Sequence, residues 1–411
     1  SLPPTPGTMT IPLNPEDFAQ LCAHASPTQD ESLLDKPTCQ HEMAYKVGLA
    51  LAAKGGFNLV NGLVSAAASA GLSGDNDLAD PEQELERRMA AAVAASLKSC
   101  IPFQLSDDPA RNSVQFLQLY AWLHAVVDVH VNAVLEALEQ SGQAENTIVV
   151  FLSDHGEYGA AHGMMIEKWH AAYQEAVHVP VVVRFPEASA SGDAPAAPDP
   201  AQIDALTSHI DILPTILGLA GVTAEERRTI AQRLALNRPV PPLPGVDLST
   251  MIKDAADGKT EFAPITDPDG LPREGVLFIT DDEITEPLPP ARTATERHSY
   301  EEFAVYKKVV DAVTNPPGGK PGVVLLPGAI KQPNHVRCVR TPDYKLARYF
   351  DPSGVVPQEW EMYDLANDPI EAINLVEVGT SPPRARSGAP EVQRVVDHLA
   401  ALLARLEKRD L

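Results

Sequence analysis

Apolar residues recur three and four positions apart over residues 113–140, and this spacing predicts one long amphipathic helix that ends before Gly142. A second stripe of this kind over residues 390–408 predicts a terminal helix with one side in the core. Residues 210–219 predict a shorter helix, because Gly221 follows as a plausible stop. The sequence therefore predicts at least three helices.

Continuous apolar runs, without polar alternation, predict buried strands at residues 147–152 and 179–185. The first run is rich in β-branched and aromatic residues, which suits a parallel strand covered on both faces. From about Met251 the runs shorten and proline-rich loops separate them. The segments 275–280, 335–340 and 344–349 predict a small antiparallel sheet.

The end of the first strand carries the most informative residues in the chain. Asp154 and His155 follow the strand directly, and Gly156 then allows a sharp turn. An open α/β sheet binds its ligands beyond the carboxyl ends of its strands, where a carboxylate and an imidazole can both reach a divalent cation. The alternative interpretation is that Asp154 caps the next turn and His155 is an ordinary loop histidine.

Composition excludes some classes of partner. The 411 residues include 56 acidic and 32 basic side chains, and the formal net charge of −24 disfavours nucleic acid and anionic membranes. Residues 55–74 are uncharged but rich in glycine, serine and asparagine, so we expect no membrane span. The four cysteines lack C-x-x-C spacing, which gives no zinc site; Cys22 and Cys39 could pair or remain buried thiols.

Several motifs occur in the order found in sulfatases of the alkaline phosphatase superfamily. They are Ser153-Asp154-His155-Gly156-Glu157, His162-Gly163 with Lys168, Tyr173-Gln174-Glu175, His209-Ile210-Asp211, Gly221-Val222, Pro244-Gly245-Val246-Asp247-Leu248, Arg340-Thr341-Pro342-Asp343-Tyr344-Lys345-Leu346, and Tyr363-Asp364-Leu365 with Asp368-Pro369-Ile370-Glu371 and Asn374-Leu375. The chain resembles the C-terminal portion of that family. Its Asp-His pair is similar to the branch containing choline sulfatases and phosphonate monoester hydrolases.

The resemblance implies an α/β fold, part of an alkaline-phosphatase-like sandwich in which helices flank a mostly parallel sheet. Residues 1–250 would form the C-terminal part of the catalytic domain. Residues 251–411 would form a smaller α+β subdomain built on a short antiparallel sheet with a terminal helix. A small-molecule sulfate ester is the implied substrate. The resemblance is compatible with a homo-oligomer.

The resemblance also assigns site residues. Asp154 and His155 are implied metal ligands, with Ca²⁺ as the family's usual ion and Mn²⁺ as an alternative that suits imidazole. Lys168 is implied to contact the sulfate or its leaving oxygen as a catalytic and substrate-binding residue. His162 would either donate a proton to the leaving group or orient its loop. His170 is a further candidate for substrate binding, whereas Glu157 is expected only to anchor the turn.

The family's nucleophile motif is missing from this sequence. Sulfatases carry a Cys or Ser in a C/S-x-P-x-R context, which becomes formylglycine, soon after a strand that ends in paired aspartates. Cys100 precedes Pro102 but then Gln104, and the threonine of Thr380-Ser381-Pro382-Pro383-Arg384 lies near the C-terminus. We therefore expect formylglycine in a missing N-terminal segment of a longer polypeptide. A phosphodiesterase or phosphonate monoester hydrolase, a noncatalytic protein and a subunit of a split enzyme are the alternatives.

Overall fold

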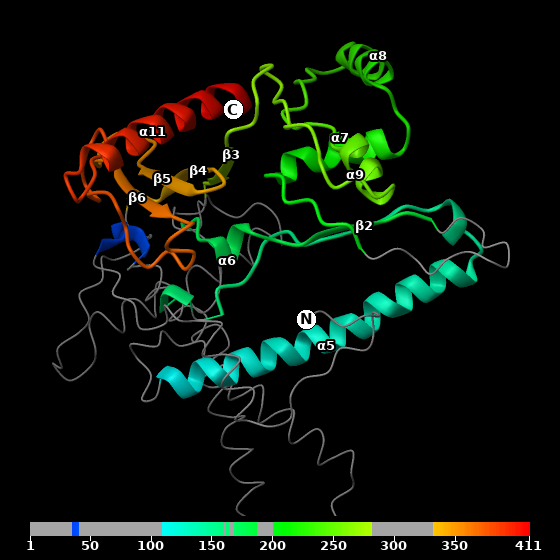
Figure 1. Cartoon of the computed structure of the whole chain (residues 1–411), viewed down its shortest axis with the longest axis horizontal. Helices are drawn as coiled ribbons and strands as arrows, with labels where there is room; N and C mark the ends of the chain where they lie inside the picture. Colours follow the sequence, from blue (N-terminus) through cyan, green and yellow to red (C-terminus); the bar gives the residue numbers. More distant parts are fainter. Residues whose placement is uncertain are drawn as a thin grey trace, which may run out of the picture.

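The structure is a computed structural model that describes residues 35–40, 109–159, 161–163, 168, 170–186, 200–281 and 332–411 (Figure 1). In chain order its elements are α5 (Pro109–Gln140), η3 (Ala144–Asn146), β1 (Val149–Leu152), η4 (Ala161–Gly163), α6 (Gln174–Val177), β2 (Val181–Arg184), η5 (His209–Asp211), α7 (Ile212–Leu219), α8 (Ala224–Ala235), α9 (Ser249–Ala256), β3 (Val276–Thr280), β4 (His335–Arg340), β5 (Tyr344–Phe350), β6 (Glu359–Asp364) and α11 (Pro390–Asp410). The uncharged stretch 55–74 and the residues Cys22 and Cys100 lie outside the described residues.

The long helices and the small sheet expected from periodicity are confirmed. Helices α5, α7 and α11 and strands β3, β4 and β5 lie at the predicted positions, which gives the α/β class with a small C-terminal antiparallel sheet. The sequence prediction missed α8, α9 and β6. Helix α8 has no buried residue, so it lacks the apolar stripe that would have revealed it, although Thr223 and Glu226 form a capping box at its start.

The prediction that β1 is a parallel strand covered on both faces is wrong for the described sheet. Strand β1 pairs antiparallel with β2, with Val149 opposite Arg184 and Leu152 opposite Val181. Phe151 is 48% exposed and Val182 is 54% exposed. An apolar run in the sequence indicates that a strand can be buried. The direction of the strand and the segments that pack on it depend on neighbouring strands and helices, which the run does not specify.

The C-terminal sheet has the strand order β3-β4-β5-β6, and every neighbouring pair is antiparallel. Helix α11 lies along one face of this sheet (Figure 1) and contacts β3, β4 and β5. The shared core contains the side chains Val339, Leu346, Met362, Val396, Leu399, Leu403 and Leu406. The stripe predicted for the terminal helix is therefore core packing.

The opposite face of the same sheet is buried by the segment that follows β1. Tyr349 and Tyr363 from the sheet pack in one cluster with Tyr158, Ala172 and Tyr173. Strand side chains alternate between faces, so β5 directs Leu346 toward α11 and Lys345 toward this second cluster. The sheet therefore holds the loop between β1 and β2 in place.

One described helix meets a length and composition criterion for a membrane span. It is the part of α5 from Phe116 to Gln140. The same segment carries Asp128, Glu136 and Glu139, and its apolar window is not buried inside the structure. One helix that meets the criterion is weak evidence for a membrane span.

Candidate active site

The turn after β1 is held against helix α6 by a close backbone approach. The Gly156 amide donates to the carbonyl oxygen of Ala176 at 2.9 Å, and a Cβ on Gly156 would lie 1.9 Å from the carbonyl oxygen of Glu175. Only glycine fits this contact. The turn therefore presents Asp154 and His155 from a fixed backbone.

Asp154 and His155 both face solvent, with side chains 85% and 51% exposed. The His155 amide donates to Asp154 Oδ1 at 2.9 Å, and His155 Nδ1 lies 2.9 Å from the Gly156 carbonyl oxygen. Because Nδ1 makes this second contact, Nε2 is the ring nitrogen that remains, and it lies 3.7 Å from Asp154 Oδ2. The backbone hydrogen bond from His155, and then the charges of His155 and Lys168, lower the pKa of Asp154. The turn thus offers an ionised carboxylate beside an imidazole nitrogen.

Lys168 reaches this turn through Glu157, which lies two residues after His155 and holds the lysine ammonium. Lys168 Nζ donates to Glu157 Oε2 at 2.6 Å, and the two side chains are 17% and 11% exposed. The structure therefore brings Lys168 to the Asp154 turn, as a shared site requires.

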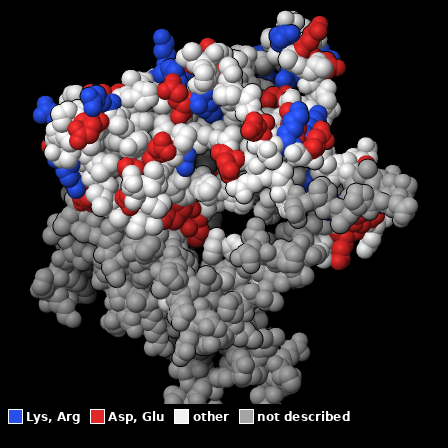
Figure 2. Space-filling model, in the orientation of Figure 1, with Lys and Arg blue, Asp and Glu red and all other residues white. Residues whose placement is uncertain are grey.

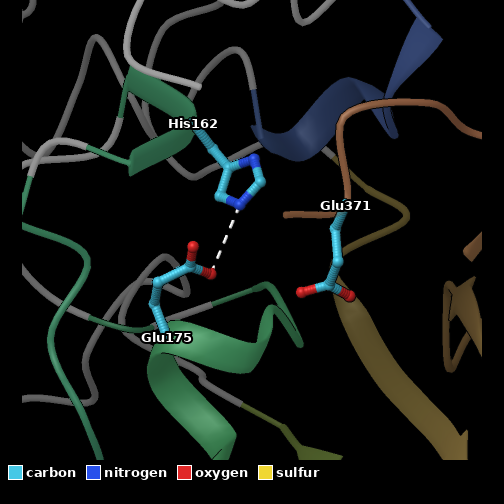
Figure 3. A group of neighbouring side chains, drawn as sticks. All are labelled: His162, Glu175 and Glu371. Atoms are coloured by element: carbon cyan, nitrogen blue, oxygen red, sulfur yellow. Dashed lines mark hydrogen bonds and ion pairs between the residues drawn. The ribbon is translucent and has the colours of Figure 1, made fainter. Parts of the chain in front are cut away.

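His162 is buried, in contrast to that exposed turn, and lies in a cluster with Glu175 and Glu371 (Figure 3). Its side chain is fully buried, its Nε2 is 3.3 Å from Glu175 Oε2, and its ring stacks on Tyr173 at a centroid distance of 3.7 Å. The backbone of His162 has φ 55°, a strained conformation for a side chain of this size. Burial opposes ionisation of Glu175, but the hydrogen bond and charge of His162 outweigh it and lower the pKa of Glu175.

One imidazole and two carboxylates could in principle hold a metal ion, because their ligand atoms all lie within 4.8 Å of one another. The ammonium of Lys345, however, forms an ion pair with Glu371, and Lys345 Nζ also donates to the Ala172 carbonyl oxygen. The amide of Gln174 donates to Glu371 Oε2 at 2.6 Å. Burial raises the pKa of Glu371, and Lys345 partly counteracts this shift. A cation is thus already present beside Glu371, and the cluster is best described as a buried ion-pair network.

His170 is also buried, and its Nδ1 lies 2.8 Å from the carbonyl oxygen of Asn334, just before β4. Its backbone has φ 55°, like that of His162. His170 is therefore a buried contact to the segment just before the C-terminal sheet, whereas Asp154 and His155 are exposed.

Several residues that organise the site were quoted in motifs but given no role by the sequence. They are Glu175, Lys345 and Glu371, all in charged pairs that join separate segments. Glu157, which was expected only to anchor the turn, also forms such a pair, with Lys168. The sequence could have indicated these residues in one way. They are charged, yet they stand in motifs whose other residues serve mainly packing and turns. On the face drawn in Figure 2, acidic and basic side chains alternate over the described residues, without a single-sign patch.

Comparisons with known proteins agree with the motifs. The family model described as Sulfatase matches residues 24–222. The chain is 34% identical over 121 residues to the Escherichia coli (strain K12) protein named uncharacterized sulfatase YidJ, an alignment that covers 29% of this chain and 22% of that protein. It is 30% identical over 108 residues to an N-acetylglucosamine-6-O-sulfatase of Bacteroides thetaiotaomicron, covering 26% of this chain and 18% of the relative. Over residues 24–222 the chain is similar to the sulfatase family, and both of these relatives are sulfatases by name.

These matches span well under two thirds of the relatives' lengths. A solved structure described as a 2-O GAG sulfatase superposes with a TM-score of 0.44 at 19% identity, covering 76% of this chain and 46% of that one.

The buried pair yields a prediction for stability. Replacing Lys345 with methionine leaves Glu371 as an uncompensated buried charge, so Lys345→Met should lower the free energy of unfolding by about 3–5 kcal/mol. Lys259, which is 58% exposed, provides the control: Lys259→Met should change it by less than about 0.5 kcal/mol. Chemical denaturation measures both. A loss below about 1 kcal/mol for Lys345→Met would show that the pair does not hold the loop.

Proposed function

We propose that this chain carries part of the active site of a sulfuric ester hydrolase. The observation that supports this most directly is the convergence of Asp154, His155 and Lys168 at the end of β1, in a chain similar to the sulfatase family. An anionic ester needs local positive charge in a protein with a net charge of −24, and a metal ion with Lys168 would supply it.

Asp154 and His155 would hold the divalent ion. A carboxylate oxygen and an imidazole nitrogen 3.7 Å apart can both contact one ion at bond lengths of about 2.0–2.6 Å. The contact between His155 Nδ1 and the Gly156 carbonyl fixes the ring so that Nε2 remains for the ion. When bound, the metal would polarise the ester and neutralise part of its charge. Ca²⁺ is the first candidate, and the imidazole also suits Mn²⁺.

Lys168 would bind the negatively charged oxygens of the sulfate and stabilise the charge that develops as the ester bond breaks. Its ammonium is already fixed by Glu157, so little reorganisation is needed when charge develops. The sequence lacks a Cys or Ser in the C/S-x-P-x-R context, so the residues assigned here bind and stabilise the ester and do not attack it.

For His162 the observed burial supports the loop-orienting role over proton donation. Its Nε2 lies beside Glu175, and its ring is covered by Tyr173. A general acid must come within hydrogen-bond reach of the leaving group. His170, with its Nδ1 beside the Asn334 carbonyl, fits the same supporting role. The division into residues 1–250 and 251–411 remains a prediction.

Metal binding tests the first part of the proposal. Asp154→Asn and His155→Ala should each weaken binding of Ca²⁺ or Mn²⁺ by at least about 10-fold, because each removes one ligand atom. Isothermal titration calorimetry measures this on the chain itself. Asp257→Asn, at an exposed carboxylate after α9, should leave the affinity unchanged. Equal affinities in all variants would reject Asp154 and His155 as ligands.

Turnover tests the second part. With the protein at its natural length and 4-nitrophenyl sulfate as substrate, Lys168→Met should lower kcat by about 10²–10³-fold, the typical cost of removing one fixed donor from a developing anion. Lys253→Met, at an exposed lysine of α9, is the control and should retain full activity. Faster turnover of 4-nitrophenyl phosphate or a phosphonate ester would identify the related phosphoesterase activity and contradict the sulfatase proposal.

A further inference from the structure

Glu157 is a nearly buried carboxylate beside the site, and the function proposed above mentions it only as the partner of Lys168. Its side chain is 11% exposed, although it lies only two residues after the exposed His155. Burying a carboxylate is costly unless it is paired. Its position therefore depends on the partners around it.

The two oxygens of Glu157 have different partners. Oε2 accepts a hydrogen bond from Lys168 Nζ at 2.6 Å, and Oε1 lies 3.5 Å from the amide nitrogen of Gly159. Among the described residues, Glu157 is the one side chain in direct contact with the Lys168 ammonium. A lysine ammonium is a point charge on a flexible four-carbon stem, so a single strong contact decides where it lies.

Helix α5 supports the Glu157 side of this contact. A Cβ on Gly159 would lie 2.8 Å from Leu117 Cδ2, which shows that α5 packs directly on the turn. Tyr120, one turn further along α5, has a pKa raised by burial and then by the charge of Glu157, so the carboxylate lies near the same helix. Glu157 is therefore backed by a 32-residue helix, whereas Lys168 itself belongs to no helix or strand.

We propose that Glu157 is a positioning residue for the site, which holds the Lys168 ammonium beside the Asp154–His155 pair. The proposal rests on the function proposed above. Without Glu157, Lys168 would be free to approach the Asp154 carboxylate or to turn into solvent. Either movement displaces the charge that should meet the sulfate. A misplacement of about 1 Å can cost about 10²-fold in rate.

The position of Lys168 can be measured without turnover. Glu157→Ala should raise the rate at which an amine-reactive reagent modifies Lys168 several-fold relative to Lys253 in the same chain, measured by peptide mass spectrometry. Glu157→Gln keeps one oxygen acceptor and should give a smaller increase. The control Glu407→Ala removes a partly buried carboxylate that pairs with Arg348 outside the site, and should leave the ratio unchanged. An unchanged ratio in Glu157→Ala would overturn the proposal.

Kinetics then separate this proposal from the function on which it rests. Glu157→Ala should lower kcat about 10–100-fold with a smaller change in KM, and Glu157→Gln should recover part of the loss. In the Lys168→Met background, Glu157→Ala should have no further effect, because Glu157 acts through Lys168. Additive losses would show a merely structural role. If Lys168→Met itself retains full turnover, the role of Lys168 in the proposed function fails, whatever the labelling shows.

Discussion

The buried ion pair between Lys345 and Glu371 is the interaction on which the described structure depends. Lys345 extends from β5, and its ammonium reaches both Glu371 and the carbonyl oxygen of Ala172. Glu371 in turn accepts from the Gln174 amide at the start of α6. The pair therefore ties the C-terminal sheet to the segment between β1 and β2. Because α6 also supports the Gly156 turn, the sheet fixes the place where Asp154 and His155 emerge.

The network around this pair gives Tyr349, Tyr363 and Glu361 fixed hydrogen-bond partners. Glu361 accepts hydrogen bonds from Tyr349 at 2.6 Å and from Tyr363 at 2.8 Å, beside the cluster that holds His162. Such buried networks are stable only when their members are satisfied, and they then specify one arrangement. The consequence is a division between a rigid, buried support and an exposed turn that offers ligand atoms to solvent.

The sequence predicted the elements with strong apolar periodicity, and it singled out Asp154 and His155 as candidate metal ligands. Helices α5 and α11 were visible because their stripes are long, and Asp154 and His155 because they directly follow a strand. The antiparallel direction of β1 and the roles of Lys345 and Glu371 were not predicted. The direction of a strand depends on the topology of the whole sheet. Lys345 and Glu371 lie 26 positions apart in sequence, so no short-range pattern connects them. The exposure of His170 and His162 likewise depends on distant segments.

The central claim is that the exposed turn after β1 holds a divalent ion, whereas the buried His162–Glu175–Glu371 cluster is held by lysine. The most direct measurement is a crystal structure of the chain with Mn²⁺, with the ion located by its anomalous scattering. The account predicts an anomalous peak within bonding distance of Asp154 and His155 Nε2. A peak between His162, Glu175 and Glu371, with Lys345 displaced, or no peak at the turn at saturating Mn²⁺, would contradict it.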